Sequence, residues 1–412
     1  MPTYAGDQKN GAVQPFRWPN KPPANCPHPR SKEISEIRFT GRWANYTDAD
    51  TWYLAWAKDG NCYSCWTDGK IYGYRCASNP WHGKNVKDQC TGQARISGDD
   101  PLNLKITNLG KMYGDWDFCH PCVSVIADGV FYIGWQRTKN LESLKGKPRS
   151  SPGDPRGLYY DGVRYSTNWN HFTEELKPNW TNNPYWTDAS DPDRNFFNET
   201  DQLAKFRYPH AVYFGQDNSL SPDGKIYFTS HGYAGGAGMV TWSKGDGIYL
   251  CRVDSKIKDV INPDAYQFWD GNEWVGKVQE SKPILEWDNH LGSESITFIP
   301  KLNKYILMSA RLKENEKNLD YNLLLFYEAD AITGPYRLVH SMRNFGPQCY
   351  FPHIPPKFIS KDGTKAWLCY SANYSQGRKN PNPKGSRYAM CLQEIEFVIA
   401  NAEHKDPRNL EQ

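Results

Sequence analysis

The chain has 412 residues, and its 49 Lys and Arg nearly balance its 46 Asp and Glu, for a formal net charge of +3. This balance gives no overall attraction to nucleic acid or to a membrane surface, although it is compatible with a local cationic groove. No run of 18 apolar residues occurs, which argues against a membrane-spanning helix. The length suits two or three average domains or one large β architecture.

Residues 1–34 are predicted to form an arm with little regular structure, because prolines recur from Pro15 to Pro29. We treat residues 35–412 as a single domain. The first 30 residues lack the apolar core of a signal peptide. The chain is therefore either cytosolic or a secreted protein whose signal has been removed.

Cysteines and glycosylation motifs favour the secreted alternative. Eleven cysteines allow up to five disulfides with one thiol left over. The pairs Cys62/Cys65 and Cys119/Cys122 also have a zinc-ligand spacing, but the first pair lies within an apparent strand, so we expect disulfides rather than zinc. Four N-x-S/T sequons fit a secreted glycoprotein and begin at Asn45, Asn179, Asn198 and Asn373.

From about residue 36, short aromatic or β-branched runs alternate with Asp-Gly pairs, each of which predicts a two-residue hairpin turn. These pairs begin at Asp59, Asp68, Asp128, Asp161, Asp223, Asp246, Asp270 and Asp362. The flanking predicted strands include 51–57, 123–126, 130–135, 226–230, 248–253, 305–310, 323–328 and 366–371. No long amphipathic helix is predicted, and residues 392–400 suit either a short helix or a last strand.

Hairpins repeated over nearly 400 residues predict an all-β fold, a β-propeller of radially arranged four-stranded sheets. At roughly 45–55 residues per blade, the length predicts about seven blades. The 16 Trp, 26 Tyr and 17 Phe suit twisted strands and core packing, and they also suit sugar binding. A propeller gathers its ligand-binding loops at one end of a central funnel.

The segment 207–232 carries the clearest functional signal. It predicts two short strands joined by the turn Pro222-Asp223-Gly224, with Arg207, His210 and His231 at or near the strand ends. Binding and catalytic groups collect at such strand ends on a rigid scaffold. One arginine and two histidines can hold an anion and move a proton, whereas the plain alternative is two ordinary hydrogen-bonded histidines.

Several segments together resemble a known group of enzymes. They are Ala49-Asp50-Thr51-Trp52-Tyr53 through Gly69, Gly98 through Leu104, the hairpin above, Glu328 through Pro335, and Phe358 through Asn373. In number and order they resemble the seven-bladed propeller group of ulvan lyases, L-rhamnose-α-1,4-D-glucuronate lyases and a related α-L-rhamnosidase family, over about residues 38–375. The resemblance implies carbohydrate substrates in which L-rhamnose is linked to a uronic acid.

Two departures from that group bear on the reaction. The rhamnosidase branch has a histidine just before the Ala-Asp-Thr-Trp-Tyr segment, whereas this chain has Gly41 through Tyr46 with no histidine, which favours a lyase. Lyase relatives have a histidine before the Thr-Gly of the second blade, where this chain has Cys90-Thr91-Gly92. Either His120, in Cys119-His120-Pro121-Cys122, takes over that role, or the protein has lost catalysis.

Elimination at a 4-linked uronate removes the proton at carbon 5 and expels the oxygen at carbon 4. The carboxylate needs a cation, and the bidentate arginine fork suits it, with Arg207 as first candidate and Arg311 as second. His210 and His120 are the leading candidates for the base, with Tyr208 as the tyrosine alternative. Either His231 or the base itself would then protonate the departing oxygen.

Other residues complete the predicted site. Tyr350 and His353 are expected either to contact sugar hydroxyls or to belong to a packed loop. A hydrolase would need two facing carboxylates, and the acidic residues near the motifs support such a pair poorly (Asp99, Asp100, Asp217 and Asp223). The chemistry requires no cofactor. A structural calcium is an expectation from the fold alone, and the sequence identifies no metal ligands.

We therefore predict a secreted, monomeric polysaccharide lyase that acts on an acidic carbohydrate and binds neither nucleic acid nor membrane. It would cleave the L-rhamnose-α-1,4-D-glucuronate linkage at side-chain ends of gum arabic or arabinogalactan, because the insertions 138–200 and 232–245 are long enough to wall a pocket. The alternatives are an ulvan lyase that cuts internally, an α-L-rhamnosidase acting on the same linkage, and a non-catalytic carbohydrate-binding propeller.

Overall fold

The computed structural model describes residues 9–78, 91–112, 119–138, 158–167, 196–197, 199, 204–235, 240–312, 322–374 and 381–400. Within these ranges the protein is almost entirely β, with 24 strands and one four-residue helix, α1 (Ile257–Val260). Short 3-10 turns occupy Gln216–Asn218, Pro263–Ala265, Val278–Glu280 and Pro356–Phe358. In the described part of the chain, no helix is long and apolar enough to cross a membrane.

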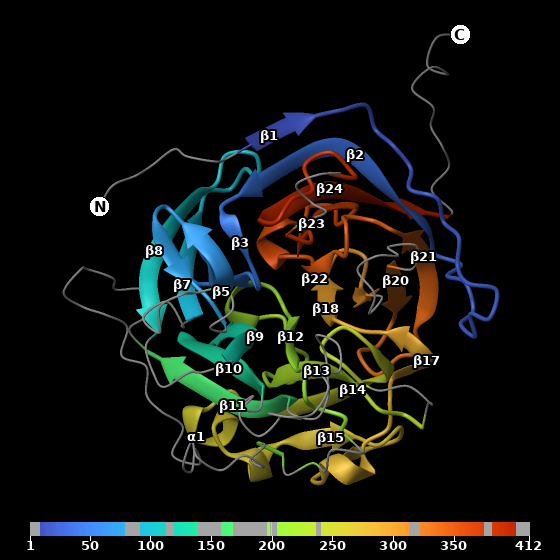
Figure 1. The fold of residues 1–412 in the computed structure, drawn as a ribbon. Helices are drawn as coiled ribbons and strands as arrows, with labels where there is room; N and C mark the ends of the chain where they lie inside the picture. The colour runs from blue at the N-terminus through green and yellow to red at the C-terminus, as the bar shows by residue number, and fades with distance from the viewer. Residues whose placement is uncertain are drawn as a thin grey trace, which may run out of the picture.

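The strands form sheets arranged around a central axis (Figure 1). The first sheet contains β3 (Asp48–Asp50), β4 (Ala55–Trp56), β5 (Cys62–Ile71), β6 (Tyr74–Cys76), β7 (Thr91–Ser97) and β8 (Lys105–Met112). The second contains β9 (Cys119–Ala127), β10 (Val130–Thr138) and β11 (Leu158–Ser166).

The largest sheet joins two radial sets through parallel pairing of β12 with β18. One set contains β12 (His210–Tyr213), β13 (Ile226–Gly232), β14 (Gly245–Val253), β15 (Gln267–Trp269), β16 (Trp274–Val275) and β17 (Leu285–Leu291). The other contains β18 (Glu294–Ile299), β19 (Lys304–Arg311), β20 (Leu323–Ala329) and β21 (Arg337–Arg343). The last sheet contains β22 (Tyr350–His353), β23 (Lys365–Ser371), β24 (Met390–Ile399), β2 (Ile34–Tyr46) and β1 (Lys9–Ala12).

The predicted all-β class is confirmed, and the radial arrangement is that of a propeller. The described strands form five radial sets, so the prediction of seven blades is not confirmed. The predicted strands from residue 123 onward coincide with β9, β10, β13, β14, β19, β20 and β23. The segment left open between helix and strand is β24, which pairs with β2 from Ile34↔Ile399 to Tyr46↔Met390 and so joins the two ends of the chain.

Five of the eight Asp-Gly pairs lie in connections between strands, but the prediction of a turn is wrong for the pairs at Asp68, Asp161 and Asp246. These three lie inside β5, β11 and β14, next to shifts in pairing register. A β-bulge inserts an extra residue and often requires glycine. At Gly69, for example, a Cβ atom would lie 2.1 Å from the carbonyl oxygen of Asp48.

The N-terminal arm follows the outer edge of the sheets, as Figure 1 shows for the blue segment between β1 and β2. Phe16 bridges to Phe39, and the Trp18 indole donates to the carbonyl of Arg343 at 3.0 Å. Farther along, His28 contacts the Tyr327 hydroxyl at 3.0 Å and the carbonyl of Glu286 at 3.1 Å. Between β1 and β2 the arm has little regular structure, whereas Lys9–Ala12 form β1 and pair with β2, and the arm is tied to the sheets at several points.

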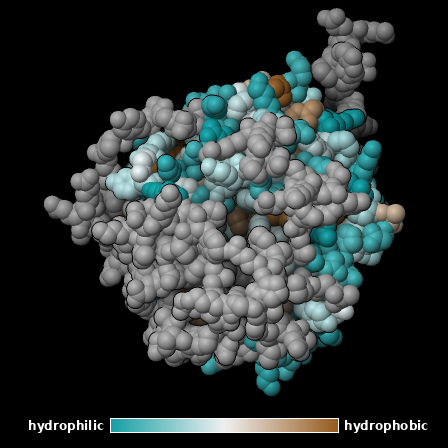
Figure 2. Space-filling view, in the orientation of Figure 1, coloured by the Kyte–Doolittle hydropathy of each residue, from teal (hydrophilic) through white to brown (hydrophobic). Residues whose placement is uncertain are grey.

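Most aromatic residues form the core between sheets, where Trp52, Trp66 and Trp135 are fully buried. The described surface exposes few large hydrophobic side chains, namely Tyr74, Leu220 and Tyr374. Accordingly, the described surface in Figure 2 is mainly hydrophilic along its upper and right edges. Core packing therefore accounts for most of the aromatic content.

The prediction of five disulfides is wrong, because nine of the 11 cysteines are present as thiols. All nine except Cys26 are buried, and burial raises the pKa of the Cys62 and Cys391 thiols to about 12. Such thiols are unreactive residues of the core. Of the four sequons, Asn45 and Asn373 are also buried, which prevents glycan attachment in the folded protein, whereas Asn179 and Asn198 lie outside the described residues.

A network of charges joins the arm to the radial set that contains β18, β19, β20 and β21. Glu328 is fully buried, and its carboxylate oxygens have no hydrogen-bond partner in the described structure. The Lys304 ammonium lies 3.6 Å from Glu328, 2.8 Å from Glu33, and in contact with Asp330. Glu33, Glu328 and Asp330 form the one group of potential metal ligands detected among the described residues, and the ammonium already compensates their charge.

We predict that Lys304→Met lowers the free energy of unfolding by about 2 kcal/mol, because it leaves the buried Glu328 carboxylate with Arg337, at 3.7 Å, as its remaining cation among the described residues. Chemical denaturation at neutral pH measures this loss. Lys301→Met, at an exposed position three residues earlier, is the matched control and should change stability little. Equal stability of the two variants would show that Lys304 does not compensate Glu328.

Candidate active site

Residues at the beginnings of inner strands, together with Tyr53 of the segment before β4, lie close to one another. His210 begins β12, Glu294 begins β18, and Phe351 lies at the start of β22. The ring centroids of Tyr53 and His210 are 5.2 Å apart, and those of His210 and Phe351 are 6.1 Å apart. We call the region around Tyr53, His210, Glu294 and Phe351 the central mouth.

His210 presents one ring nitrogen as a lone-pair acceptor. Its Nδ1 lies 2.9 Å from the carbonyl oxygen of Cys122, so Nδ1 carries the proton that it donates there. The other nitrogen, Nε2, is then unprotonated in the neutral ring. Burial lowers the pKa of His210, while the nearby Glu294 partly opposes that shift. The neutral ring is therefore the dominant form at neutral pH, as a general base requires.

His231 is held differently, by acceptors on both sides. Its Nδ1 lies 2.7 Å from Oε2 of Glu294, and its Nε2 lies 2.7 Å from the carbonyl oxygen of Thr241. Nε2 must donate to the carbonyl, and a second proton is shared between Nδ1 and Glu294. The His231 ring also stacks on Tyr208, with centroids 4.8 Å apart and planes 9° apart. This arrangement fixes Tyr208 and leaves His231 no nitrogen for a substrate.

Three buried oxygen atoms near these histidines have no hydrogen-bond partner in the described structure. They are the hydroxyls of Tyr53 and Tyr208 and Oε1 of Glu294. Burial raises the pKa of both phenols, which keeps them protonated as donors. Unsatisfied buried polar groups are costly. A ligand rich in hydroxyl or carboxylate groups, or ordered water, would satisfy them.

Arg207 places a buried positive charge at the same end of β12. Its side chain is buried, and its charge lowers the pKa of the Tyr208 phenol against the larger effect of burial. Glu199 lies within electrostatic range of Arg207 and accepts hydrogen bonds from the amides of Lys205 and Phe206. Burial raises the pKa of Glu199 to about 7. Glu199 therefore anchors the segment that carries Arg207.

The last sheet contributes an aromatic wall. Trp242 contacts the rings of Tyr350 and Phe351, at centroid distances of 5.5 and 6.1 Å. The Tyr350 hydroxyl donates to Gln348 at 2.6 Å and accepts from the Asn373 amide at 2.9 Å. Tyr350 is thus fixed beside Phe351 at the edge of the central mouth, and its contact with a sugar stays a prediction.

His353 is bound by the backbone on both ring nitrogens. Nε2 accepts from the Leu54 amide at 3.2 Å, and Nδ1 donates to the carbonyl of Phe351 at 3.1 Å. Burial lowers its pKa to about 4. This geometry agrees with the packed-loop alternative, because Nε2 joins β22 to the segment before β4, Nδ1 bonds within β22, and both nitrogens are thus occupied by the backbone.

His120 belongs to a second group of residues, which contains two carboxyl groups. Its Nδ1 lies 4.0 Å from Oδ2 of Asp68, whose carboxylate also accepts from Ser78. Asp50 is buried nearby, and burial together with the charge of Asp68 raises its pKa well above the usual range. Tyr388 hydrogen-bonds to Asp50 and also donates to the carbonyl oxygen of Asp68. Asp50 is therefore a protonated acid that lies next to the ionisable side chains of Asp68 and His120.

The structure thus brings Arg207, Tyr208, His210 and His231 together, with Tyr350 and His353 at the edge of the same mouth. Arg311, the second candidate cation, lies within electrostatic range of His290. Sequence reasoning missed Glu294, Tyr53 and Asp50. The latter two belong to the Ala49–Tyr53 segment that carried the family resemblance, so their polar side chains were a usable signal, whereas Glu294 lies in no motif.

Comparisons with known proteins do not identify the family. No protein-family model and no curated protein matches the sequence. A putative hydrolase from Bacteroides ovatus is similar over 89% of this chain and 92% of its own, at 11% identity and a TM-score of 0.45. A GH43_1 enzyme from Xanthomonas citri covers 86% and 91%, at 12% identity and a TM-score of 0.44.

An α-L-arabinanase variant from Cellvibrio cellulosa is similar over 85% of this chain and 92% of its own, at 12% identity and a TM-score of 0.42. Likenesses this distant carry no argument about the reaction. The resemblance to the rhamnose–glucuronate lyase group is not confirmed and stays a prediction, as do the roles of the site residues and the structural calcium.

We predict that His353 makes the protein less stable in acid. Its folded pKa of about 4 lies below the ordinary value near 6.5. The stability that depends on the neutral ring is therefore complete above pH 6.5 and is lost as the pH falls toward 4. This loss amounts to about 3 kcal/mol.

His353→Gln retains an acceptor for the Leu54 amide but does not titrate in this range. Denaturant unfolding at several pH values between 7 and 4 should show a shallower loss of stability for this variant than for the wild type. Parallel profiles for the two proteins would contradict the assignment.

Proposed function

We propose that the protein is a polysaccharide lyase that cleaves the L-rhamnose-α-1,4-D-glucuronate linkage by β-elimination, at side-chain ends of gum arabic or arabinogalactan. The observation that carries the proposal is the neutral His210, whose Nε2 is an acceptor at the central mouth, beside Tyr208 and the buried Arg207. The sequence resemblance supplies the sugar pair. The proposed enzyme is secreted and monomeric.

In this mechanism, Arg207 neutralises the uronate carboxylate and so makes the proton at carbon 5 more acidic. Nε2 of His210 removes that proton, and the electrons of the C–H bond form the double bond between carbons 4 and 5. The bond between carbon 4 and its oxygen breaks, and the oxygen leaves with the rhamnose. A proton must then reach the departing oxygen.

The geometry favours Tyr208 over His231 as the proton donor. The Tyr208 hydroxyl has no partner, and its raised pKa keeps it protonated, whereas both nitrogens of His231 are occupied. The same raised pKa argues against Tyr208 as the base. His231 and Glu294 then act as positioning residues, because the stacked ring of His231 holds Tyr208 in place.

We predict that the wild-type protein produces the ultraviolet absorbance of a 4,5-unsaturated uronate from gum arabic, together with free rhamnose. His210→Gln and Arg207→Gln should each reduce this rate at least 100-fold, as is usual for the loss of a positioned base or charge. Arg343→Gln, at an exposed position, is the control and should retain full activity. The acidic limb of the wild-type pH profile should lie below pH 6.5, because the pKa of His210 is lowered.

Other outcomes of the assay decide between the alternatives. Absorbance from ulvan but not from gum arabic would indicate internal cleavage and contradict the proposed substrate. Rhamnose release without absorbance would indicate hydrolysis. The absence of both, with retained binding of the polymer, would indicate a non-catalytic binding protein.

One observation favours a hydrolase, an α-L-rhamnosidase, as the second candidate. The raised pKa of Asp50 makes it a potential general acid in the group around His120, and Glu294, in the neighbouring central mouth, is a second buried carboxyl group. Hydrolysis of glycosides uses such a pair, whereas the proposed elimination uses neither group directly.

Asp50→Asn separates the two candidates, because asparagine keeps the shape and hydrogen bonds of a protonated carboxyl but cannot donate the catalytic proton. If the protein is a lyase, we predict that this variant stays within about tenfold of the wild-type rate, since general acid catalysis contributes 100-fold or more where it operates. Rhamnose release and ultraviolet absorbance are measured on the same samples. A loss of rhamnose release of 100-fold or more would favour the hydrolase.

A further inference from the structure

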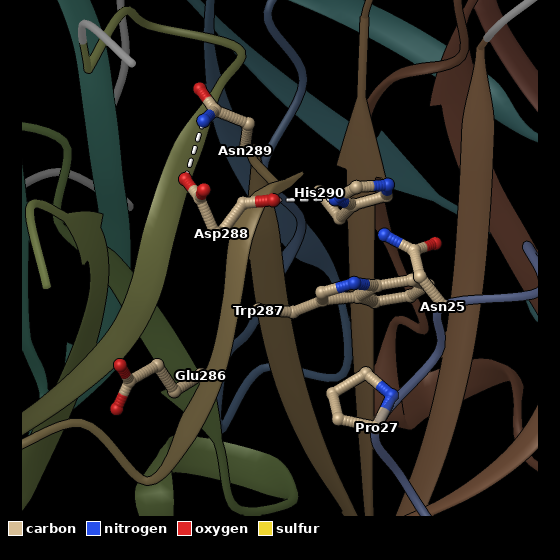
Figure 3. Close-up of a pocket in the computed structure, with 7 residues that line it drawn as sticks. All are labelled: Asn25, Pro27, Glu286, Trp287, Asp288, Asn289 and His290. Atoms are coloured by element: carbon tan, nitrogen blue, oxygen red, sulfur yellow. Dashed lines mark hydrogen bonds between the residues drawn. The ribbon is translucent and has the colours of Figure 1, made fainter. Parts of the chain in front are cut away.

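A pocket of about 630 Å³ lies on β17, away from the inner strands (Figure 3). Its wall on one side is β17, and on the other it is the N-terminal arm. The lining residues are Asn25, Pro27, Glu286, Trp287, Asp288, Asn289 and His290. The volume is within the range of small-molecule sites, roughly 300–1,000 Å³.

The floor of this β17 pocket is a rigid pair of rings. Trp287 and His290 stack with centroids 4.3 Å apart and planes 3° apart, and His28 of the arm packs edge-on against Trp287. Trp287 is 5% exposed, and its Nε1–H has no hydrogen-bond partner in the described structure. Because a buried donor without an acceptor is costly, an incoming oxygen atom that reached Nε1 would be stabilised.

The residues around the pocket supply both hydrogen-bond donors and acceptors. Asn25 of the arm faces the ring pair, whereas the side chains of Glu286, Asp288 and Asn289 leave β17 on the other side, where the Asn289 side-chain amide donates to the Asp288 carboxylate (Figure 3). The Asn25 amide beside the aromatic rings matches the hydroxyls and the C–H face of a sugar ring.

The charge of the pocket distinguishes it from the central mouth. Asp246, the aspartate of the bulge in β14, lies beside the pocket, where it accepts from the backbone N–H of Asn289 at 3.0 Å. Its pKa is raised, mainly by burial, with the neighbouring Asp288 adding to the effect. Three carboxyl groups, those of Glu286, Asp288 and Asp246, thus lie on or beside β17, against the cation Arg311, which is within electrostatic range of His290. This excess of negative charge disfavours acidic sugars.

We propose that the β17 pocket is a second carbohydrate-binding site, specific for a neutral saccharide unit. It is separate from the central mouth and stands whether or not that mouth catalyses elimination. The arm completes it, because His28 bonds to Tyr327 and to Glu286 and thereby places Asn25 and Pro27 opposite the ring pair. On a polysaccharide with neutral and acidic units, the central mouth would bind an acidic unit and the β17 pocket a neutral one.

The test is calorimetric titration of the full-length His210→Gln protein, which should be catalytically silent, with galactotriose, maltotriose and cellotriose. We expect at least one of these neutral trisaccharides to bind at millimolar concentration. Adding Trp287→Phe, which keeps an aromatic ring but removes the N–H with the five-membered ring, should weaken binding about fivefold, the usual value of one hydrogen bond. Trp274→Phe, on β16 of the same sheet, is the matched control outside the pocket and should bind like the parent.

Asn25→Ala provides a second variant, because this exposed arm residue can be removed without disturbing the packed rings, and it should also weaken binding. The proposal is overturned if no neutral trisaccharide binds, if both pocket variants bind like the parent, or if glucuronic acid competes at this site as well as the neutral sugars do. Failure of elimination in the wild type, by contrast, would overturn only the proposed reaction.

Discussion

The pairing of β2 with β24 is the constraint on which the rest of the structure depends. It joins the beginning of the chain to its end within one sheet, from Ile34↔Ile399 to Tyr46↔Met390. The first and last inner segments therefore become neighbours, and His353 of β22 accepts from the Leu54 amide of the first sheet. Without this closure, Tyr53 would not meet Phe351 and His210, and the central mouth would lack one wall.

Burial then determines the chemistry at the mouth. The same loss of water lowers the pKa of His210 and raises those of Tyr208 and Asp50. Desolvation disfavours every charged form, so it creates a neutral base, a protonated phenol and a protonated carboxyl group near one axis. The hydrogen bonds assign the roles further, because the Cys122 carbonyl fixes the tautomer of His210, whereas Glu294 and Thr241 occupy both nitrogens of His231.

Local pattern predicted much of the fold and part of the site. Alternating runs such as 123–126 and 130–135, joined at Asp128-Gly129, predicted their strands because side-chain period and turn chemistry agree over a few residues. The same rule failed at Asp68 and Asp246, where the glycine belongs to a bulge within a strand.

One hairpin carries Arg207, Tyr208, His210 and His231, and this is why the sequence predicted that they come together. Glu294 lies 63 residues from His231, and its role follows only from the pairing of β12 with β18, which no local pattern encodes. The thiols show the opposite error, since cysteine number suggested disulfides while the strands bury the cysteines separately.

The most direct test of the central claim is a crystal structure of the His210→Gln protein with a bound oligosaccharide that ends in L-rhamnose-α-1,4-D-glucuronate. The account predicts the uronate carboxylate on Arg207, the C5 hydrogen facing the side chain at position 210, and the glycosidic oxygen within hydrogen-bond distance of the Tyr208 hydroxyl. A sugar bound with its glycosidic oxygen on Asp50, and with no contact between its carboxylate and Arg207, would contradict the account.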